Sequence, residues 1–81
     1  MHELSIAQSI VEIVRRHLPA GESRHVKLVR LRVGDRAGIA PESLAFCFKL
    51  AGDGTALRDA KLEIEPVSGD ALNVVDVELE E

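Results

Sequence analysis

Residues 25–34 read HVKLVRLRVG, and this stretch decides the fold. From Val29 to Val33, apolar residues at every second position alternate with Arg30 and Arg32. This period of two is typical of a strand with one buried and one solvated face. The sequence therefore predicts a strand over residues 25–33, ended by Gly34, that packs against other elements on one side only.

Two helical segments flank this strand in the sequence. Residues 4–18 place apolar side chains at the three-then-four spacing of one helical face. The stretch Ser5-Ile6-Ala7-Gln8 matches a capping box, which favours a helix start near Ser5 or a residue or two earlier. Residues 41–50 predict a second helix, with Pro41 at its first position and Gly52-Asp53-Gly54 as its stop.

Two further strands are predicted in the last third of the chain. Residues 60–67 alternate apolar and charged side chains, and so do residues 72–79, where Val75, Val77 and Leu79 form the apolar series. The short turn Ser68-Gly69-Asp70 predicts that these two strands pair as an antiparallel hairpin. The expected fold is α+β, a two-layer sandwich in the order α-β-α-β-β, with two helices covering one face of a three-stranded sheet.

Length and composition limit the classes of protein that the chain can represent. Its 81 residues suit a single domain, 1–81, and the 46% of apolar residues can form a core. An aromatic content of 2% leaves almost no side chains to stack on bases, and the net charge is −4, so we expect no nucleic-acid partner. The charged residues are mostly basic in the range 15–36 and mostly acidic in the range 60–81. We interpret these halves as solvated faces of opposite sign.

Residues 4–81 contain no motif that predicts a catalytic or binding site. Cys47 is the only cysteine, which excludes an internal disulfide, and we expect it to be a buried apolar residue. The start shows neither a signal peptide nor a membrane span, so we expect a cytoplasmic protein without a membrane partner. His17 and His25 fit surface positions, Asp35 and Glu42 fit an ordinary loop and helix start, and no catalytic set is apparent. We therefore predict that the chain is not an enzyme.

The first three residues, Met1-His2-Glu3, concentrate nitrogen donors for a metal. The Met1 amine and the His2 amide close a five-membered chelate ring, and that amide and the imidazole close a six-membered one. The Glu3 amide can complete four nitrogens in a plane, a geometry that suits Ni(II) or Cu(II) better than Zn(II). We expect Met1 to be retained, because processing generally needs a small second residue. Since the donors must lose protons, the affinity should fall with pH.

The same start resembles the HypA/HybF family of hydrogenase nickel-insertion proteins. The resemblance runs through Met1-His2-Glu3-Leu4-Ser5, Ile10-Val11, Val29, Leu31, Val33, Gly34, Gly38, Pro41-Glu42, Leu44, Phe46, Phe48 and Leu62-Glu63-Ile64. It implies a nickel metallochaperone whose Ni(II) sits on Met1 and His2, with Glu3 beside them. It also implies two partners, a HypB-type GTPase and the hydrogenase large subunit, and a role for some similar proteins in urease maturation.

The sequence departs from this family at one place. Family members carry a zinc domain with two Cys-x-x-Cys pairs between the second and last strands, whereas this chain has a short turn near 67–71. We therefore expect no zinc in this chain and interpret the difference as an excision, engineered or natural. A shortened loop of this kind is compatible with a monomer or a strand-swapped dimer. The alternative function is a protein-interaction module without a metal function; a small enzyme ranks last.

Overall fold

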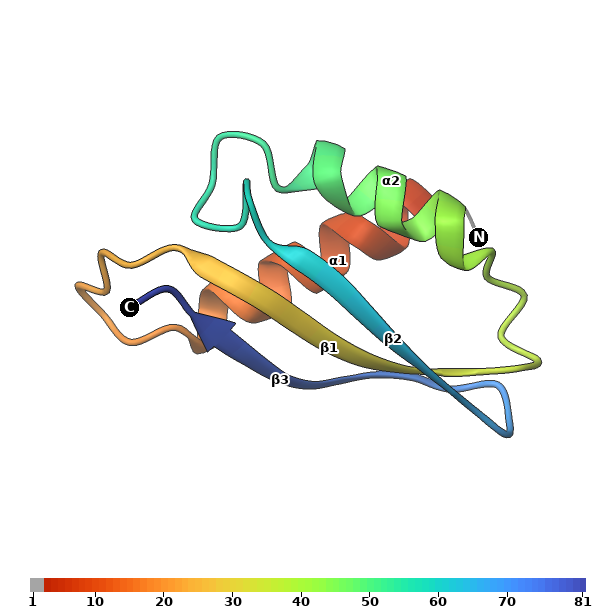
Figure 1. The fold of residues 1–81 in the computed structure, drawn as a ribbon. Helices are drawn as coiled ribbons and strands as arrows, with labels where there is room; N and C mark the ends of the chain where they lie inside the picture. The colour runs from red at the N-terminus through yellow and green to blue at the C-terminus, as the bar shows by residue number, and fades with distance from the viewer. Residues whose placement is uncertain (1–2) are drawn as a thin grey trace.

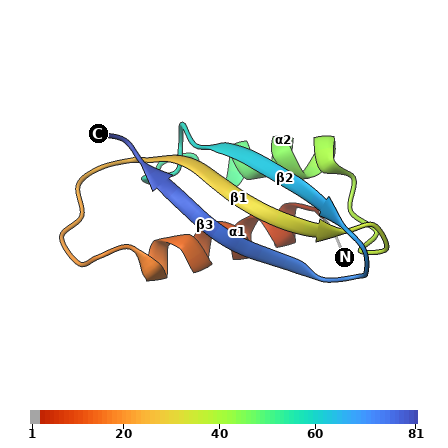
Figure 2. The same cartoon turned by 60° about the horizontal axis from the view of Figure 1, so that its bottom comes forward.

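The computed structural model describes residues 3–81 and confirms the predicted fold class (Figure 1). The elements are α1 (Glu3–His17), β1 (Val26–Gly34), α2 (Pro41–Ala51), β2 (Lys61–Val67) and β3 (Leu72–Leu79). Both helices lie on one face of the three-stranded sheet (Figures 1 and 2). Helix α1 begins at Glu3, the earlier of the starts that the sequence allowed, so Ser5 lies inside the helix.

The order of the sheet is β2-β1-β3, which makes the predicted β2–β3 hairpin wrong. Strand β1 pairs parallel with β2 and antiparallel with β3, and it lies between them from Leu28 to Val33. The reason lies in burial, because β1 carries the fully buried Val26, Val29 and Leu31, whereas the inward residues of β2 and β3 are only half-buried. The turn near 67–71 therefore connects the two edges of the sheet, about 10 Å apart, and four residues can span that distance.

The predicted apolar series of the last strand is wrong at Val75, where the strand contains a β-bulge. Arg30 pairs with Asp76 and Leu31 pairs with Val74, so Val75 has no partner of its own. Val77 and Leu79 pack against the core as predicted, but the extra residue shifts the inward positions to Val74 and Leu72 for the rest of the strand. Val75 is 42% exposed, because the bulge turns it away from the core.

The core lies between the inner face of the sheet and the two helices. The centre of the apolar stripe of α1 is buried as predicted, whereas Leu4 and Ile13 of the same stripe are exposed. Helix α2 contributes Leu44 and Phe48, as its spacing predicted. Leu57, in the loop between α2 and β2, is also fully buried, and Gly52 lets the backbone approach its carbonyl closely. The buried set comprises Ala7, Ile10, Val11, Val14, Val26, Val29, Leu31, Val33, Leu44, Phe48 and Leu57.

The outer face of the sheet brings the basic and acidic halves of the sequence together. Arg30, on the central strand, pairs with Glu63 of β2 at 3.3 Å, with Asp76 of β3 at 2.8 Å, and with Glu78. Two residues further along β1, on the same face, Arg32 pairs with Glu65 at 2.9 Å. The interpretation as two separate faces of opposite sign is therefore wrong, because β-pairing places both signs on one face.

The helices of residues 3–81 are too short and too polar to span a bilayer.

Candidate metal site at the N-terminal end of helix α1

Of the three predicted metal ligands, the structure describes only Glu3, which begins α1. Met1 and His2 are outside the described residues. Glu3 is the first residue of the helix and is half-buried. A carboxylate at this position interacts favourably with the positive end of the helix dipole, and it would also offset the repulsion of a bound cation by that end.

Helix α2 reaches this site with Ser43, a residue that the sequence reasoning did not single out. The Ser43 hydroxyl donates a hydrogen bond of 3.5 Å to Glu3 Oε1, at the long limit of such bonds. Ser43 precedes the buried Leu44 in the first turn of α2, so it lies beside α1 when Leu44 enters the core. The pattern of Leu44 and Phe48 places this face toward α1, but nothing in the sequence pairs the hydroxyl with Glu3.

The connection between β2 and β3 crosses the end of β1 at Gly34. The amide of Gly34 donates to the Ala71 carbonyl at 2.8 Å, and the amide of Arg36 donates to the Gly69 carbonyl at 2.7 Å. A Cβ atom on Gly34 would collide with the Gly69 carbonyl and lie 2.8 Å from the Asp70 nitrogen. Glycine is therefore required at position 34, because the crossing chain occupies the space of a side chain.

Asp35 also belongs to this crossing, and in the described part of the chain it is not in a group of side chains that could hold a metal ion. Its Oδ1 accepts a hydrogen bond of 3.0 Å from the amide of Gly69, and its own amide donates to Val67 at 2.8 Å. Figures 1 and 2 place the crossing at the same end of the molecule as the start of α1. Segments that are more than 60 residues apart in the sequence thus lie at one end of the fold.

The remaining candidates from the sequence lie elsewhere. His17 is exposed in the last turn of α1, where its Nδ1 lies 2.8 Å from the Ile13 carbonyl oxygen. The Nδ1 atom of His25 lies 3.8 Å from Glu80 Oε1. Cys47 is half-buried against the core, which supports its interpretation as an apolar residue. Within residues 3–81, no three His, Cys, Asp or Glu side chains form a group that could hold a metal ion.

The sequence profile of the family described as "Hydrogenase/urease nickel incorporation, metallochaperone, hypA" matches residues 1–72. The chain belongs to the HypA family. The match includes the predicted metal ligands, both helices and the first two strands. It therefore confirms the resemblance that the N-terminal residues indicated.

Curated HypA proteins agree with this assignment. The chain is 46% identical over 72 residues to a hydrogenase maturation factor HypA from Streptomyces avermitilis, covering 88% of this chain and 55% of that protein. It is 45% identical to those of Geobacter sp. strain M21 and Archaeoglobus fulgidus, covering 85% and 79% of this chain and 60% and 58% of theirs. The chain thus spans less than two thirds of the length of these HypA relatives.

A solved structure shares the fold. The solution structure of the Ni metallochaperone HypA from Helicobacter pylori superposes with a TM-score of 0.81 at 14% sequence identity, covering 98% of this chain and 97% of that one. This superposition includes β3, which lies almost wholly beyond the family match in sequence. The α-β-α-β-β sandwich is therefore a HypA fold.

Proposed function

We propose that this chain is a nickel metallochaperone domain that binds Ni(II) at its N-terminus. The observation that carries the proposal is the match to a nickel-incorporation family, which begins at residue 1 and so includes Met1-His2-Glu3. The proposed ligands are the Met1 amine, the His2 imidazole and the backbone amides of residues 2 and 3. Glu3, which opens α1, supplies negative charge beside them.

The proposed chemistry favours transfer over storage. Four nitrogens in a plane suit Ni(II), but ligands on a single short segment leave the metal open to a competing donor set. The positive end of α1 also opposes a cation, by about 0.3–1 kcal/mol at an exposed helix end. We propose a HypB-type GTPase and the hydrogenase large subunit as partners in the transfer, urease maturation as a further use, and a cytoplasmic location without catalytic activity of the chain's own.

Nickel titration of the untagged protein tests the ligand set. His2→Ala should weaken the affinity at least about tenfold, because it removes the imidazole and one chelate ring. One residue added before Met1 should have a similar effect, because it displaces the amine. The wild-type complex should show the d–d absorbance of square-planar nickel. His17→Ala is the matched control, since His17 is exposed on the same helix about 20 Å away. Unchanged affinity in His2→Ala would refute the site.

Two smaller changes test the role of the helix start. Glu3→Gln should weaken nickel binding about two- to fivefold, which corresponds to the energy of one charge at a helix end. Ser43→Ala should change the affinity less than about twofold, because a hydrogen bond of 3.5 Å holds Glu3 weakly. A larger effect of Ser43→Ala than of Glu3→Gln would show that α2, and not the carboxylate charge, controls the site.

A protein-interaction module is the second candidate function. Phe46 and Leu50, one turn apart on α2, are 65% and 56% exposed, and aromatic side chains such as Phe are enriched at interfaces. On this hypothesis, Phe46→Gln with Leu50→Gln abolishes binding of the GTPase or large subunit and leaves nickel affinity unchanged. If His2→Ala has no effect on nickel while the double variant loses a partner, this function replaces the first.

A further inference from the structure

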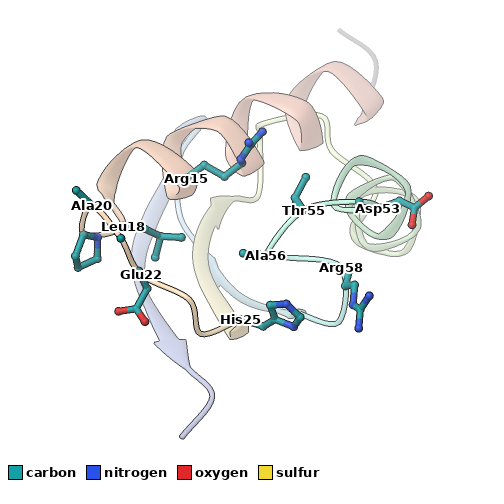
Figure 3. A pocket seen from close by; sticks show the side chains of 12 residues that line it. Arg15, Leu18, Ala20, Glu22, His25, Asp53, Thr55, Ala56 and Arg58 are labelled. Atoms are coloured by element: carbon teal, nitrogen blue, oxygen red, sulfur yellow. The ribbon is translucent and has the colours of Figure 1, made fainter.

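A polar cavity of about 700 Å³ lies at the opposite end of α1 from the proposed nickel site (Figure 3). The lining comes from the last turn of α1 with Leu18, the turn 19–22, His25 just before β1, and the loop 53–58 that follows α2. A helix of 15 residues is about 22 Å long, so the cavity is well separated from Glu3. Nothing in the proposed nickel function uses it.

Basic side chains reach this cavity from three separate parts of the chain. Arg15 comes from α1, His25 precedes β1, and Arg58 ends the loop 53–58. Arg15 makes no ion pair within residues 3–81. The partners of the other two are exposed, with Arg58 at 3.3 Å from its neighbour Asp59 and His25 at 3.8 Å from Glu80.

The acidic side chains of the lining do not neutralise these groups. Glu22 is paired with Arg24, whose Nε and Nη2 donate hydrogen bonds of 2.9 and 3.0 Å to its two carboxylate oxygens. Asp53 points away from Ala56 and Thr55 toward solvent (Figure 3). Thr55 is held in the loop, since its hydroxyl donates to the Gly52 carbonyl at 2.7 Å and accepts from the Leu57 amide at 3.0 Å. Among residues 3–81, Arg15 is therefore the basic side chain of the lining without an ion pair, and the exposed partners of Arg58 and His25 could be replaced by a bound anion.

We propose that this cavity binds a small, multiply charged oxyanion. Guanidinium groups match the oxygen geometry of phosphate and carboxylate, and charge-assisted hydrogen bonds to such groups are among the strongest. The volume is that of a small-molecule site, which is larger than one inorganic ion needs. The occupant is thus a metabolite that carries two or more phosphate or carboxylate groups.

Amide NMR titration of the metal-free protein tests this proposal, with pyrophosphate and citrate as separate probes at constant ionic strength. Saturable shifts should appear at residues 15–25 and 53–58 and not around Glu3. Arg15→Gln and Arg58→Gln should each weaken binding about fivefold, the effect of one ion pair in a partly open site. Arg16→Gln is the matched control, because Arg16 is exposed, adjacent to Arg15, and paired with Glu12 at 3.1 Å.

The outcomes separate the possible sources of the anion. Binding of pyrophosphate alone assigns the cavity to phosphate compounds, binding of citrate alone assigns it to polycarboxylates, and binding of both supports a general oxyanion site. No saturable shift in the loop 53–58, or equal losses in Arg15→Gln and Arg16→Gln, overturns the proposal. His2→Ala should retain anion binding, so this result is independent of the nickel hypothesis.

Discussion

Gly34 is the residue on which the connection between the sheet edges depends. Gly34→Ala should lower the free energy of unfolding by about 2–4 kcal/mol, because a Cβ atom meets backbone of the crossing chain that has no flexible end to yield. Chemical denaturation measures this loss. Gly38→Ala is the control, since its Cβ meets open space and only the left-handed backbone, φ 71°, opposes it, at about 1 kcal/mol. Equal losses would show that the crossing is loose.

The ion pair of Glu22 with Arg24 should make the stability of the fold depend on pH under acidic conditions. The hydrogen bonds from the Arg24 side chain and amide lower the pKa of Glu22 from 4.5 to about 2. The carboxylate therefore contributes stability above pH 4.5, and this contribution is lost as the pH falls through about 2. A ¹³C NMR titration of the Glu22 carboxyl should show a midpoint near 2, and Arg24→Gln should move it toward 4.5. A wild-type midpoint near 4.5 would contradict the pairing.

At the scale of elements, Arg30 holds the three strands together on their outer face. The hydrogen bonds that Arg30 donates to Asp76 and Glu78 raise the pKa of Arg30 above its ordinary value, and Glu63 is the third carboxylate beside it. Arg30→Met leaves three carboxylates facing one another across the strands, so Tm should fall by a few degrees. Salt near 1 M should recover part of the loss, because it screens that repulsion. Arg32→Met removes one ion pair only and should therefore lower Tm less than Arg30→Met does. An equal decrease of Tm in both variants that does not depend on salt would contradict this account.

Both edge strands carry features that limit pairing with other chains. Pro66 lies in β2, where it offers no amide to a neighbouring strand, and the bulge at Val75 interrupts the edge of β3. Both features lie at the edges of the sheet, because β2 and β3 each pair with β1 on one side only.

The periodicity of the sequence predicted the elements well but not their pairing. Alternation identified Val29, Leu31 and Val33 as the inward residues of β1, because the pattern reflects burial within one element. It did not identify Val26, which is also buried, because the pairing register shifts between Val26 and Leu28. The pairing of β2 with β3 failed, since a short turn is compatible either with a hairpin or with a crossing over a central strand. The bulge at Val75 was also missed, because one extra valine in an apolar strand leaves no mark in the pattern.

The metal ligands Met1-His2-Glu3 stay a prediction from donor chemistry, although the family match includes these residues. The contact of Ser43 with Glu3 could not be predicted, because it needs the packing of α2 on α1. The cavity near Arg15 was likewise invisible in the sequence, because His25 and Arg58 reach it from segments 10 and 43 residues further along the chain.

For the molecule as a whole, metal content is the decisive measurement. Plasma mass spectrometry of the protein after dialysis against both metals should find about one nickel per chain and no zinc, since the single cysteine excludes an intrachain cysteine-only zinc site. Size-exclusion chromatography of the same sample should show whether nickel loading accompanies a monomer or a strand-swapped dimer. One zinc per chain with no nickel would contradict the proposed site.

The four residues between β2 and β3, which cross over Gly34, lie at a point of the chain where an insertion leaves the sheet intact. Strand β3 is held by its own antiparallel ladder to β1, so the sheet does not depend on how long the chain between β2 and β3 is. Lengthening a connection costs little entropy, about 0.6 kcal/mol for each doubling. A whole accessory module can therefore be gained or lost between Val67 and Leu72 without rebuilding the sheet, and it would emerge at the end of the molecule where α1 begins.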